Sequence, residues 1–241
     1  MHNDACNNCS NCKIYNKCAL VFVGPPGCGK GTQASFLQKD YEFVAFAAGD
    51  ELRKEIASGS ELGLEIKGIC DSGGLVSDSV INVMVDNFVA KTSANRLLFD
   101  GYPRKVSQAE ALDEVFAKDS DWLLEVCYFQ ISNESIADRI LHRFSCAGCG
   151  CVYNERTARP RVEGVCDKCG SKEFSKRNDD NEESIMKRLE TYRLMTASII
   201  DFYKERGILN IIDASLGFAE VSQQVEKVVK CVLEKLFEER R

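Results

Sequence analysis

The stretch GPPGCGKGTQ, residues 24–33, comes directly after the apolar run ALVFV at residues 19–23. It nearly fits the pattern of a glycine, four residues of any type and then Gly-Lys-Ser/Thr. Gly31 stands where the hydroxyl residue is expected, and Thr32 follows one position late. Because a short apolar run is typical of a buried strand, this stretch predicts a strand, a glycine-rich turn and a helix over residues 30–40.

The glycine-rich turn has the features of a phosphate-binding loop. Gly24, Gly27 and Gly29 allow backbone N–H groups to converge on an anion, and the next helix adds the partial positive charge of its N-terminus. Lys30 supplies a mobile ammonium for phosphate oxygens. A purely structural turn is the alternative, but a strand before it and a helix after it are the context that phosphate binding requires. Because the hydroxyl of the motif is displaced, we expect its magnesium contact to be weakened or replaced by water.

The composition is that of an ordinary globular protein. Of the 241 residues, 44% are hydrophobic and 28% are charged. No apolar run approaches the ~20 residues that span a bilayer, and the N-terminus resembles neither a signal peptide nor an Arg-rich transit peptide. The formal net charge of −6 disfavours nucleic acids and anionic membranes as partners. We therefore expect a cytoplasmic protein that binds neither.

Strand and helix patterns alternate along the chain. Apolar runs predict strands at residues 19–24, 42–46, 96–104, 122–131 and 208–213. Helical patterns separate these runs, one long helix is expected to end at Gly207, and a last amphipathic helix is expected over residues 217–240. Such alternation predicts an α/β fold, in which a parallel sheet carries helices on both faces.

Five segments occur in the order and spacing seen in adenylate kinases: GPPGCGKGTQ (24–33), AAGDELRKEI (47–56), DGYPRKVSQA (100–109), DRILHR (138–143) and RNDDNEESIMKRL (177–189). The chain resembles the long, zinc-lid form of this nucleoside monophosphate kinase family over roughly residues 19–240. The resemblance implies a P-loop NTPase-like core with a five-stranded sheet. It also implies the magnesium-dependent, reversible reaction ATP + AMP = 2 ADP, by in-line transfer in a closed site of a monomer.

The resemblance divides the chain into four parts. A small helical insertion binds the monophosphate, and a second insertion is the zinc-binding lid. A Cys-rich N-terminal extension lies outside the resemblance. The ranges are 1–18 for the extension, 19–46, 77–142 and 181–241 for the core, 47–76 for the monophosphate-binding insertion and 143–180 for the lid.

Phosphoryl transfer between two nucleotides needs positioning and charge neutralisation more than covalent help. Arginines suit this task, since they are permanently charged and bind phosphate through two N–H groups. By resemblance, Arg53 and Arg104 grip the AMP phosphate, and Arg139 stacks on the ATP base. The expected catalytic residues are Lys30, Arg104, Arg139, Arg143, Arg177 and Arg188.

The resemblance also implies two nucleotide sites and a magnesium site. The implied ATP-binding residues are Gly27, Cys28, Gly29, Lys30, Gly31, Thr32, Arg139 and Arg143. The implied AMP-binding residues are Ala48, Arg53, Val76, Gly101, Arg104, Gln108, Arg177 and Arg188. Asp100 matches an aspartate that holds magnesium through water. Asp179 and Asp180 match an acidic pair that either orients the arginines or the hydrated metal, or stabilises the dipole of the next helix.

Two positions bear on the choice of monophosphate. Gln108 matches the glutamine that reads the adenine edge of AMP, because an amide both donates and accepts hydrogen bonds. Ala48 replaces the threonine typical of the family, and an alanine there resembles UMP/CMP kinases. We favour AMP, since the zinc lid and Gln108 together outweigh Ala48. Another kinase of the family, with UMP/CMP or GTP:AMP specificity, is the alternative.

The strongest metal signal lies in CAGCGCVYNERTARPRVEGVCDKCG, residues 146–170. Two Cys-x2-Cys pairs, Cys146 with Cys149 and Cys166 with Cys169, predict two tight turns whose sulfurs point at one tetrahedral zinc ion. Closed four-thiolate coordination makes that zinc structural, and it staples a segment too small to bury a core. The segment should close over the phosphates as a lid that excludes water.

Four more cysteines lie ahead of the first predicted strand: Cys6, Cys9, Cys12 and Cys18. Their spacing matches neither a paired zinc turn nor a ferredoxin run, so they either bind a second metal or form a tail of free thiols. Cys70, Cys127 and Cys231 are expected to be buried apolar fillers. In a third interpretation of the chain, it is a non-catalytic zinc-ribbon scaffold that binds nucleotide, but the full set of arginines counts against this.

Overall fold

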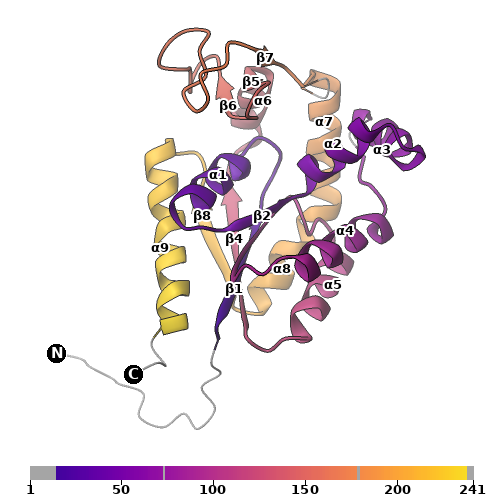
Figure 1. The fold of residues 1–241 in the computed structure, drawn as a ribbon, viewed down its shortest axis with the longest axis vertical. Helices are drawn as coiled ribbons and strands as arrows, with labels where there is room; N and C mark the ends of the chain where they lie inside the picture. The colour runs from indigo at the N-terminus through magenta and orange to yellow at the C-terminus, as the bar shows by residue number, and fades with distance from the viewer. Residues whose placement is uncertain (1–14, 73, 178–179, 238–241) are drawn as a thin grey trace, which may run out of the picture.

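Five parallel strands form the central sheet of the computed structural model, which describes residues 15–72, 74–177 and 180–237 (Figure 1). In their order across the sheet they are β2 (Val44–Ala47), β3 (Arg96–Asp100), β1 (Lys17–Val23), β4 (Trp122–Gln130) and β8 (Leu209–Asp213). The expected α/β fold with a five-stranded parallel sheet is confirmed. Because the strands are parallel, their carboxyl ends share one edge, where ligands bind in such sheets.

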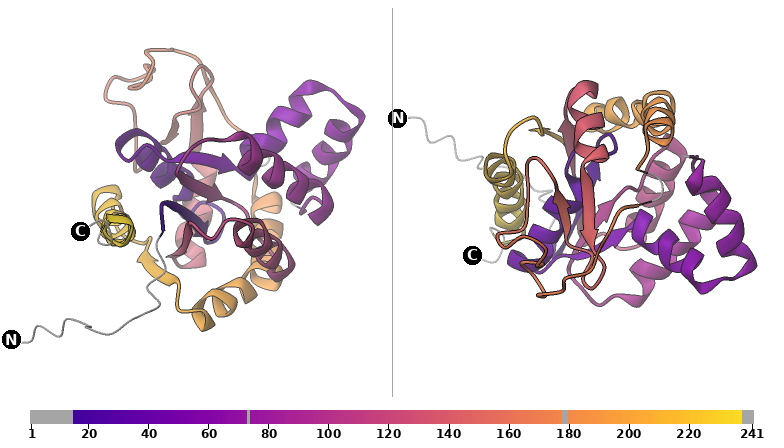
Figure 2. Two further views of the ribbon diagram at one scale, coloured as in Figure 1. Left: turned by 60° about the horizontal axis from the view of Figure 1, so that its bottom comes forward. Right: turned by 90° about the horizontal axis from the view of Figure 1, so that it is seen from above.

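Helices cover both faces of the sheet (Figures 1 and 2). One face carries α1 (Lys30–Asp40) and α9 (Phe218–Phe237), and the other carries α4 (Asp78–Lys91), α5 (Val106–Ala117) and α8 (Ser198–Glu205). In β1, Leu20 and Phe22 pack in the first core, whereas Val21 and Val23 pack in the second. Since successive strand side chains point to opposite faces, the continuous apolar run of β1 fills both cores.

Two insertions project from the core (Figure 1). The first is a pair of helices between β2 and α4, α2 (Ala48–Ser58) and α3 (Glu61–Asp71). The second follows α6 (Asn133–Leu141) and holds an antiparallel sheet of β5 (Arg143–Cys146), β6 (Val152–Asn154) and β7 (Phe174–Ser175), with β5 in the middle. In Figure 1 this small sheet lies above the main sheet and the α2–α3 pair stands beside it.

The long helix expected to end at Gly207 is interrupted. It consists of α7 (Glu182–Thr191), a π-helical turn η1 (Tyr192–Thr196) and α8. The Ala197 N–H donates to the Tyr192 carbonyl at 3.1 Å, a five-residue step that inserts one extra residue into the helix. No helix in the described ranges combines the length and the apolar character that crossing a membrane requires.

Three cysteines differ from expectation. β1 begins at Lys17, so Cys18 lies inside the strand and not ahead of it. Its N–H donates to the Asn95 carbonyl at 2.9 Å, and its side chain is completely buried in the core of the sheet, apart from the extension. This burial raises the pKa of its thiol to about 12. Cys127 is buried as predicted, whereas Cys231 is exposed and Cys70 is half-buried. The expectations for Cys6, Cys9 and Cys12 lie outside the described residues.

Candidate active site

The glycine-rich turn between β1 and α1 has the backbone conformation that its glycines allow. Gly27 and Gly29 adopt positive φ angles of 77° and 102°, which residues with a side chain rarely take. A Cβ atom on Gly27 would also lie 2.5 Å from the Ile140 side chain. Gly29 is the N-cap of α1 and has no side chain that could accept a hydrogen bond from the helix. It therefore does not cap the first N–H groups of the helix, which face the turn. These are the properties of an anion-binding loop.

Lys30 folds back over this loop. Its Nζ atom donates to the carbonyl oxygens of Gly24 at 2.8 Å and Pro25 at 2.9 Å, and it lies 3.4 Å from the Cys28 sulfur. An ammonium group has three protons, and these three contacts hold it directly at the cradle. Thr32 is exposed on the first turn of α1.

Asp100 ends β3 beside the cradle, where its backbone is paired with Phe22 of β1. A Cβ atom on Gly31 would lie 3.4 Å from Asp100 Oδ2, so the missing side chain at Gly31 leaves the carboxylate room against the start of α1. Burial raises the pKa of Asp100, the charges of Lys30 and Arg104 oppose this in part, and the nearby Asp50 adds to it. The replacement of the usual hydroxyl residue by Gly31 is thus matched by the close approach of Asp100, a contact that sequence reasoning missed.

Arg104 follows the turn after β3. Its Nε atom donates to the Gly101 carbonyl at 2.8 Å, and a Cβ atom on Gly101 would meet its guanidinium at 3.1 Å. Desolvation and the charge of Arg188 lower the pKa of Arg104, and Arg53 adds a smaller effect. Arg53 itself is paired with Asp50 on α2. Arginines from three separate parts of the chain therefore lie near one another.

Arg143 and Arg188 meet at Asp180. Arg143 Nε donates to Asp180 Oδ2 at 2.8 Å, and its Nη2 donates to Oδ1. Arg188 Nη1 lies 3.6 Å from the same Oδ1 atom, and only 2% of the Asp180 side chain is exposed. Of the two interpretations of the acidic pair, orientation of arginines fits Asp180, while Asp179 lies outside the described residues.

The other predicted residues are placed less uniformly. Arg177 is close enough to Asp100 for its charge to lower the pKa of that carboxyl. Arg139 instead reaches the loop after β8, where its Nη1 donates to the Ala214 carbonyl at 2.9 Å. Ala48 is buried at the start of α2, 3.8 Å from where a Gly101 Cβ would lie, and Val76 is buried just before α4.

Gln108 is 3% exposed near the start of α5. Its Oε1 atom accepts from the Arg104 N–H at 2.7 Å, and its Nε2 atom donates to Asp78 Oδ1 at 2.9 Å. Asp78 was missed by sequence reasoning, because an acidic residue that follows Ser77 at the start of a helix is typical of an ordinary helix N-terminus.

The four lid cysteines form one cluster, with all sulfurs within 4.8 Å of one another. The Cys146–Cys169 and Cys149–Cys166 sulfur pairs are each 3.5 Å apart, close to the roughly 3.8 Å expected between thiolates of a tetrahedral zinc site with 2.3 Å bonds. The two halves match: Gly150 N–H donates to the Cys146 carbonyl and Gly170 N–H to the Cys166 carbonyl. The donor set and spacing therefore fit zinc, and Cys151 is outside the set.

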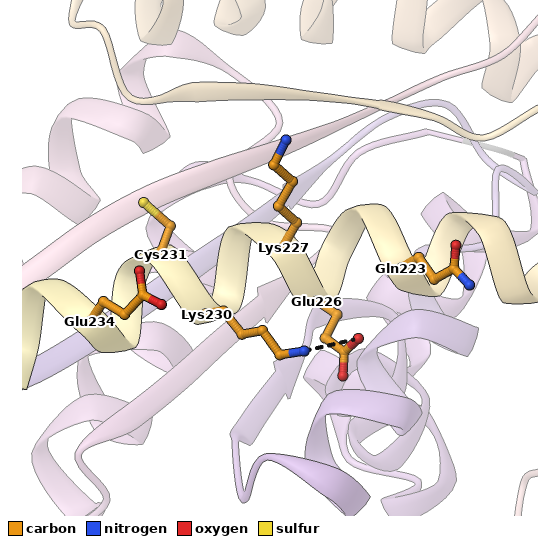
Figure 3. Close-up of a pocket in the computed structure, with 6 residues that line it drawn as sticks. All are labelled: Gln223, Glu226, Lys227, Lys230, Cys231 and Glu234. Atoms are coloured by element: carbon orange, nitrogen blue, oxygen red, sulfur yellow. Dashed lines mark ion pairs between the residues drawn. The ribbon is translucent and has the colours of Figure 1, made fainter. Parts of the chain in front are cut away.

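A separate hollow follows one side of α9 (Figure 3). Six side chains of that helix line it: Gln223, Glu226, Lys227, Lys230, Cys231 and Glu234. Lys230 is paired with Glu226 at 3.4 Å. The positive charges of the two lysines in the lining equal the negative charges of its two glutamates. Since a single helix supplies the lining and no predicted site residue is part of it, we assign no ligand to this hollow.

The described features define the class of the protein. A glycine-rich cradle with its lysine, a half-buried carboxylate beside it and converging arginines lie at the carboxyl ends of parallel strands, which is the arrangement of a P-loop phosphotransferase.

Comparison with known proteins identifies the family within that class. The adenylate kinase family model matches residues 22–208. The chain is 40% identical over 211 residues to an adenylate kinase of Paramagnetospirillum magneticum, which covers 87% of this chain and 97% of that protein. It is 39% identical to an adenylate kinase of Erythrobacter litoralis, over 88% of this chain and 99% of that protein. It is 40% identical to an adenylate kinase of Caldanaerobacter subterraneus, over 87% of this chain and 95% of that protein. The chain belongs to the adenylate kinase family.

Proposed function

We propose that this phosphotransferase transfers the terminal phosphoryl group of ATP to AMP reversibly, ATP + AMP = 2 ADP, with magnesium. The observation that carries the proposal is the set of charges around Asp100, to which Lys30, Arg104 and Arg177 contribute from three parts of the chain. A loose phosphoryl-transfer transition state requires such fixed positive charge. No residue needs to form a covalent intermediate.

The proposed roles are those that the resemblance to adenylate kinases implies. The cradle and Lys30 hold the ATP phosphates, and Arg53 and Arg104 hold the AMP phosphate. The proposed ligands of the transferred group and the ATP phosphates are Arg139, Arg143, Arg177 and Arg188. Asp100 would hold hydrated magnesium, which neutralises charge on the phosphate oxygens when bound. Burial raises the pKa of Asp100, and the neighbouring ammonium and guanidinium groups offset part of that rise, which favours the ionised carboxylate that this role needs.

The lid supplies a stable platform for Arg143 and Arg177. We propose one structural zinc ion held by Cys146, Cys149, Cys166 and Cys169. Phe144, Tyr153 and Phe174 pack together beside the cluster, and they form a core too small to be stable alone. Closure of the lid over the phosphates would exclude water and prevent simple hydrolysis of ATP.

The experiment is a nucleotide panel with coupled detection of ADP. With ATP as donor we expect AMP to be the best acceptor, and GTP as a second donor tests the donor side. Lys30→Met and Arg104→Ala should each lower kcat/KM by about 10²–10³-fold. The control Lys39→Met, an exposed lysine in the last turn of α1, should change it less than twofold. If the chain binds ATP but transfers phosphate to no monophosphate, the result would instead support the interpretation of the chain as a non-catalytic scaffold.

The residue at position 48 favours UMP or CMP as an alternative acceptor. Ala48 is buried and lies against the Gly101 turn, so the hydroxyl that a threonine would offer to the acceptor base is absent. UMP or CMP as the preferred acceptor in the panel would favour that alternative. The monomeric state and the cytoplasmic location stay predictions, and light scattering tests the first.

A further inference from the structure

The Gln108 side chain is clamped at both ends of its amide. The Arg104 backbone N–H, a donor, lies 2.7 Å from Oε1, and Asp78 Oδ1, an acceptor, lies 2.9 Å from Nε2. The Tyr102 hydroxyl donates to the Gln108 carbonyl at 3.1 Å, so the backbone of this residue is held as well. An amide oxygen has two lone pairs and an amide nitrogen two protons, which leaves one acceptor and one donor for a ligand.

The two contacts exclude the flipped amide. Rotation by 180° would place the Gln108 NH₂ group against the Arg104 N–H and the Gln108 oxygen against the Asp78 carboxylate. The first pairing joins two donors and the second joins two acceptors, so two hydrogen bonds would be replaced by two repulsive contacts in a buried place.

Asp78 is suited to enforce this choice. Lys105 Nζ donates to its Oδ1 and Ser107 Oγ to its Oδ2, both at 2.9 Å. Although burial acts to raise it, hydrogen bonds from Lys105, Ser107 and Gln108 hold the pKa of Asp78 below its ordinary value. The ionised carboxylate can only accept hydrogen bonds, and it sits in a fixed frame.

Adenine and guanine present opposite patterns to such an amide. Adenine offers a donor at its 6-amino group and an acceptor at N1, whereas guanine offers an acceptor at O6 and a donor at N1. A freely rotating glutamine matches either base by flipping, but a fixed one matches a single pattern.

We propose that Asp78 is a positioning residue that sets acceptor-base specificity by locking the Gln108 amide in the orientation that pairs with adenine. The inference rests on the proposed function, in which Gln108 faces the base of the monophosphate. It adds a residue 30 positions away that, together with the Arg104 N–H, decides which base this glutamine accepts.

The test compares AMP with IMP as acceptors, with ATP as donor in the full chain. IMP carries the O6 and N1–H pattern without the 2-amino group, so size does not confound the comparison. In Asp78→Ala the ratio of kcat/KM for IMP to that for AMP should rise about 10- to 100-fold, mainly through KM for the monophosphate. Asp78→Ser serves if the alanine variant does not fold, since a hydroxyl both donates and accepts and so cannot lock the amide.

Asp78→Asn provides the rescue. Its oxygen can stay between Lys105 and Gln108, which both donate to Oδ1, so the preference for AMP should stay within about threefold of the parent although the charge is lost. Ser77→Ala is the matched control at the start of α4, because the Ser77 hydroxyl contacts Ser79 and makes no bond to Gln108. It should leave the ratio unchanged.

The outcomes distinguish failure of the proposed Asp78 lock from failure of the proposed function. A parent chain that prefers AMP to IMP, with folded alanine and serine variants of Asp78 that keep the same ratio, overturns the lock. Equal relaxation in the asparagine and alanine variants also overturns it, because the effect would then follow charge and not amide orientation. A parent chain that prefers UMP or CMP overturns the proposed function itself.

Discussion

Asp180 accepts two hydrogen bonds from the guanidinium of Arg143, across 37 positions of sequence, in a forked arrangement that excludes solvent from the carboxylate. The pair joins the first strand of the lid to the segment just before α7. Arg188 of α7 approaches the same carboxylate at 3.6 Å. A single buried acid therefore sets the direction of two arginines that are proposed to meet phosphate.

We expect Asp180→Ala to reduce kcat by about 10- to 100-fold, because both arginines lose the group that orients them. Steady-state kinetics with saturating AMP measures this. Arg156→Ala is the control, since it removes another lid arginine paired with an aspartate, but in a pair that is largely exposed. It should change kcat less than twofold. Full activity in a folded Asp180→Ala variant would show that the pairing is only structural.

The second prediction concerns the pH dependence of stability. The folded-state pKa of Asp100 is raised, mainly by burial, so the unfolded chain releases this proton first as the pH rises. Ionised Asp100 therefore costs stability above its ordinary pKa near 4, and increasingly so up to the raised value. Asp100→Asn should raise the Tm by about 2–4 °C at pH 8 and by less at pH 4. Activity should fall, since the proposed magnesium ligand is lost.

Asp119→Asn is the control of opposite sign. The hydrogen bond from Lys17 lowers the pKa of Asp119, so its charge stabilises the fold above the ordinary pKa and this contribution is lost as the pH falls. The substitution should not raise the Tm at pH 8. Thermal melts of both variants across pH 4–8 distinguish the signs, and a Tm for Asp100→Asn below that of the parent at every pH contradicts the burial argument.

The third prediction concerns metal. We expect about one zinc ion per chain by elemental analysis, and almost none in Cys166→Ser, with loss of lid stability on chelation. Cys151→Ser should keep the zinc, because Cys151 lies outside the four-sulfur cluster. A variant lacking residues 1–14 tests the extension. Metal content that falls on this truncation would reveal a second site there.

The fourth prediction tests the burial of Cys18. Cys18→Ser places a hydroxyl in an apolar core and should lower the free energy of unfolding by about 1–3 kcal/mol. It should leave the metal content unchanged, as should Cys18→Ala. Chemical denaturation and elemental analysis check the two parts. Loss of metal in both variants would return Cys18 to the ligand set.

Features that depend on short spacing can be predicted from the residues alone. The run from β1 through Gly24, Gly29 and Lys30 predicts the cradle, since strand period, glycine conformation and helix start are local properties. The two Cys-x2-Cys pairs predict their cluster because each turn is formed by four consecutive residues. Alternation of strands and helices predicts the parallel sheet, because each element is recognised from its own local pattern.

The pairing of distant groups depends on the folded chain and could not be predicted from local patterns. Cys18 belongs to β1 because its N–H bonds to Asn95, and no local pattern marks that partner. Asp180 and Asp78 both resemble ordinary charges near helix starts, and their roles emerge only when folding brings Arg143 and Gln108 against them. Strand register and helix packing set long-range hydrogen bonds, whereas sequence periodicity indicates only which face of an element is apolar.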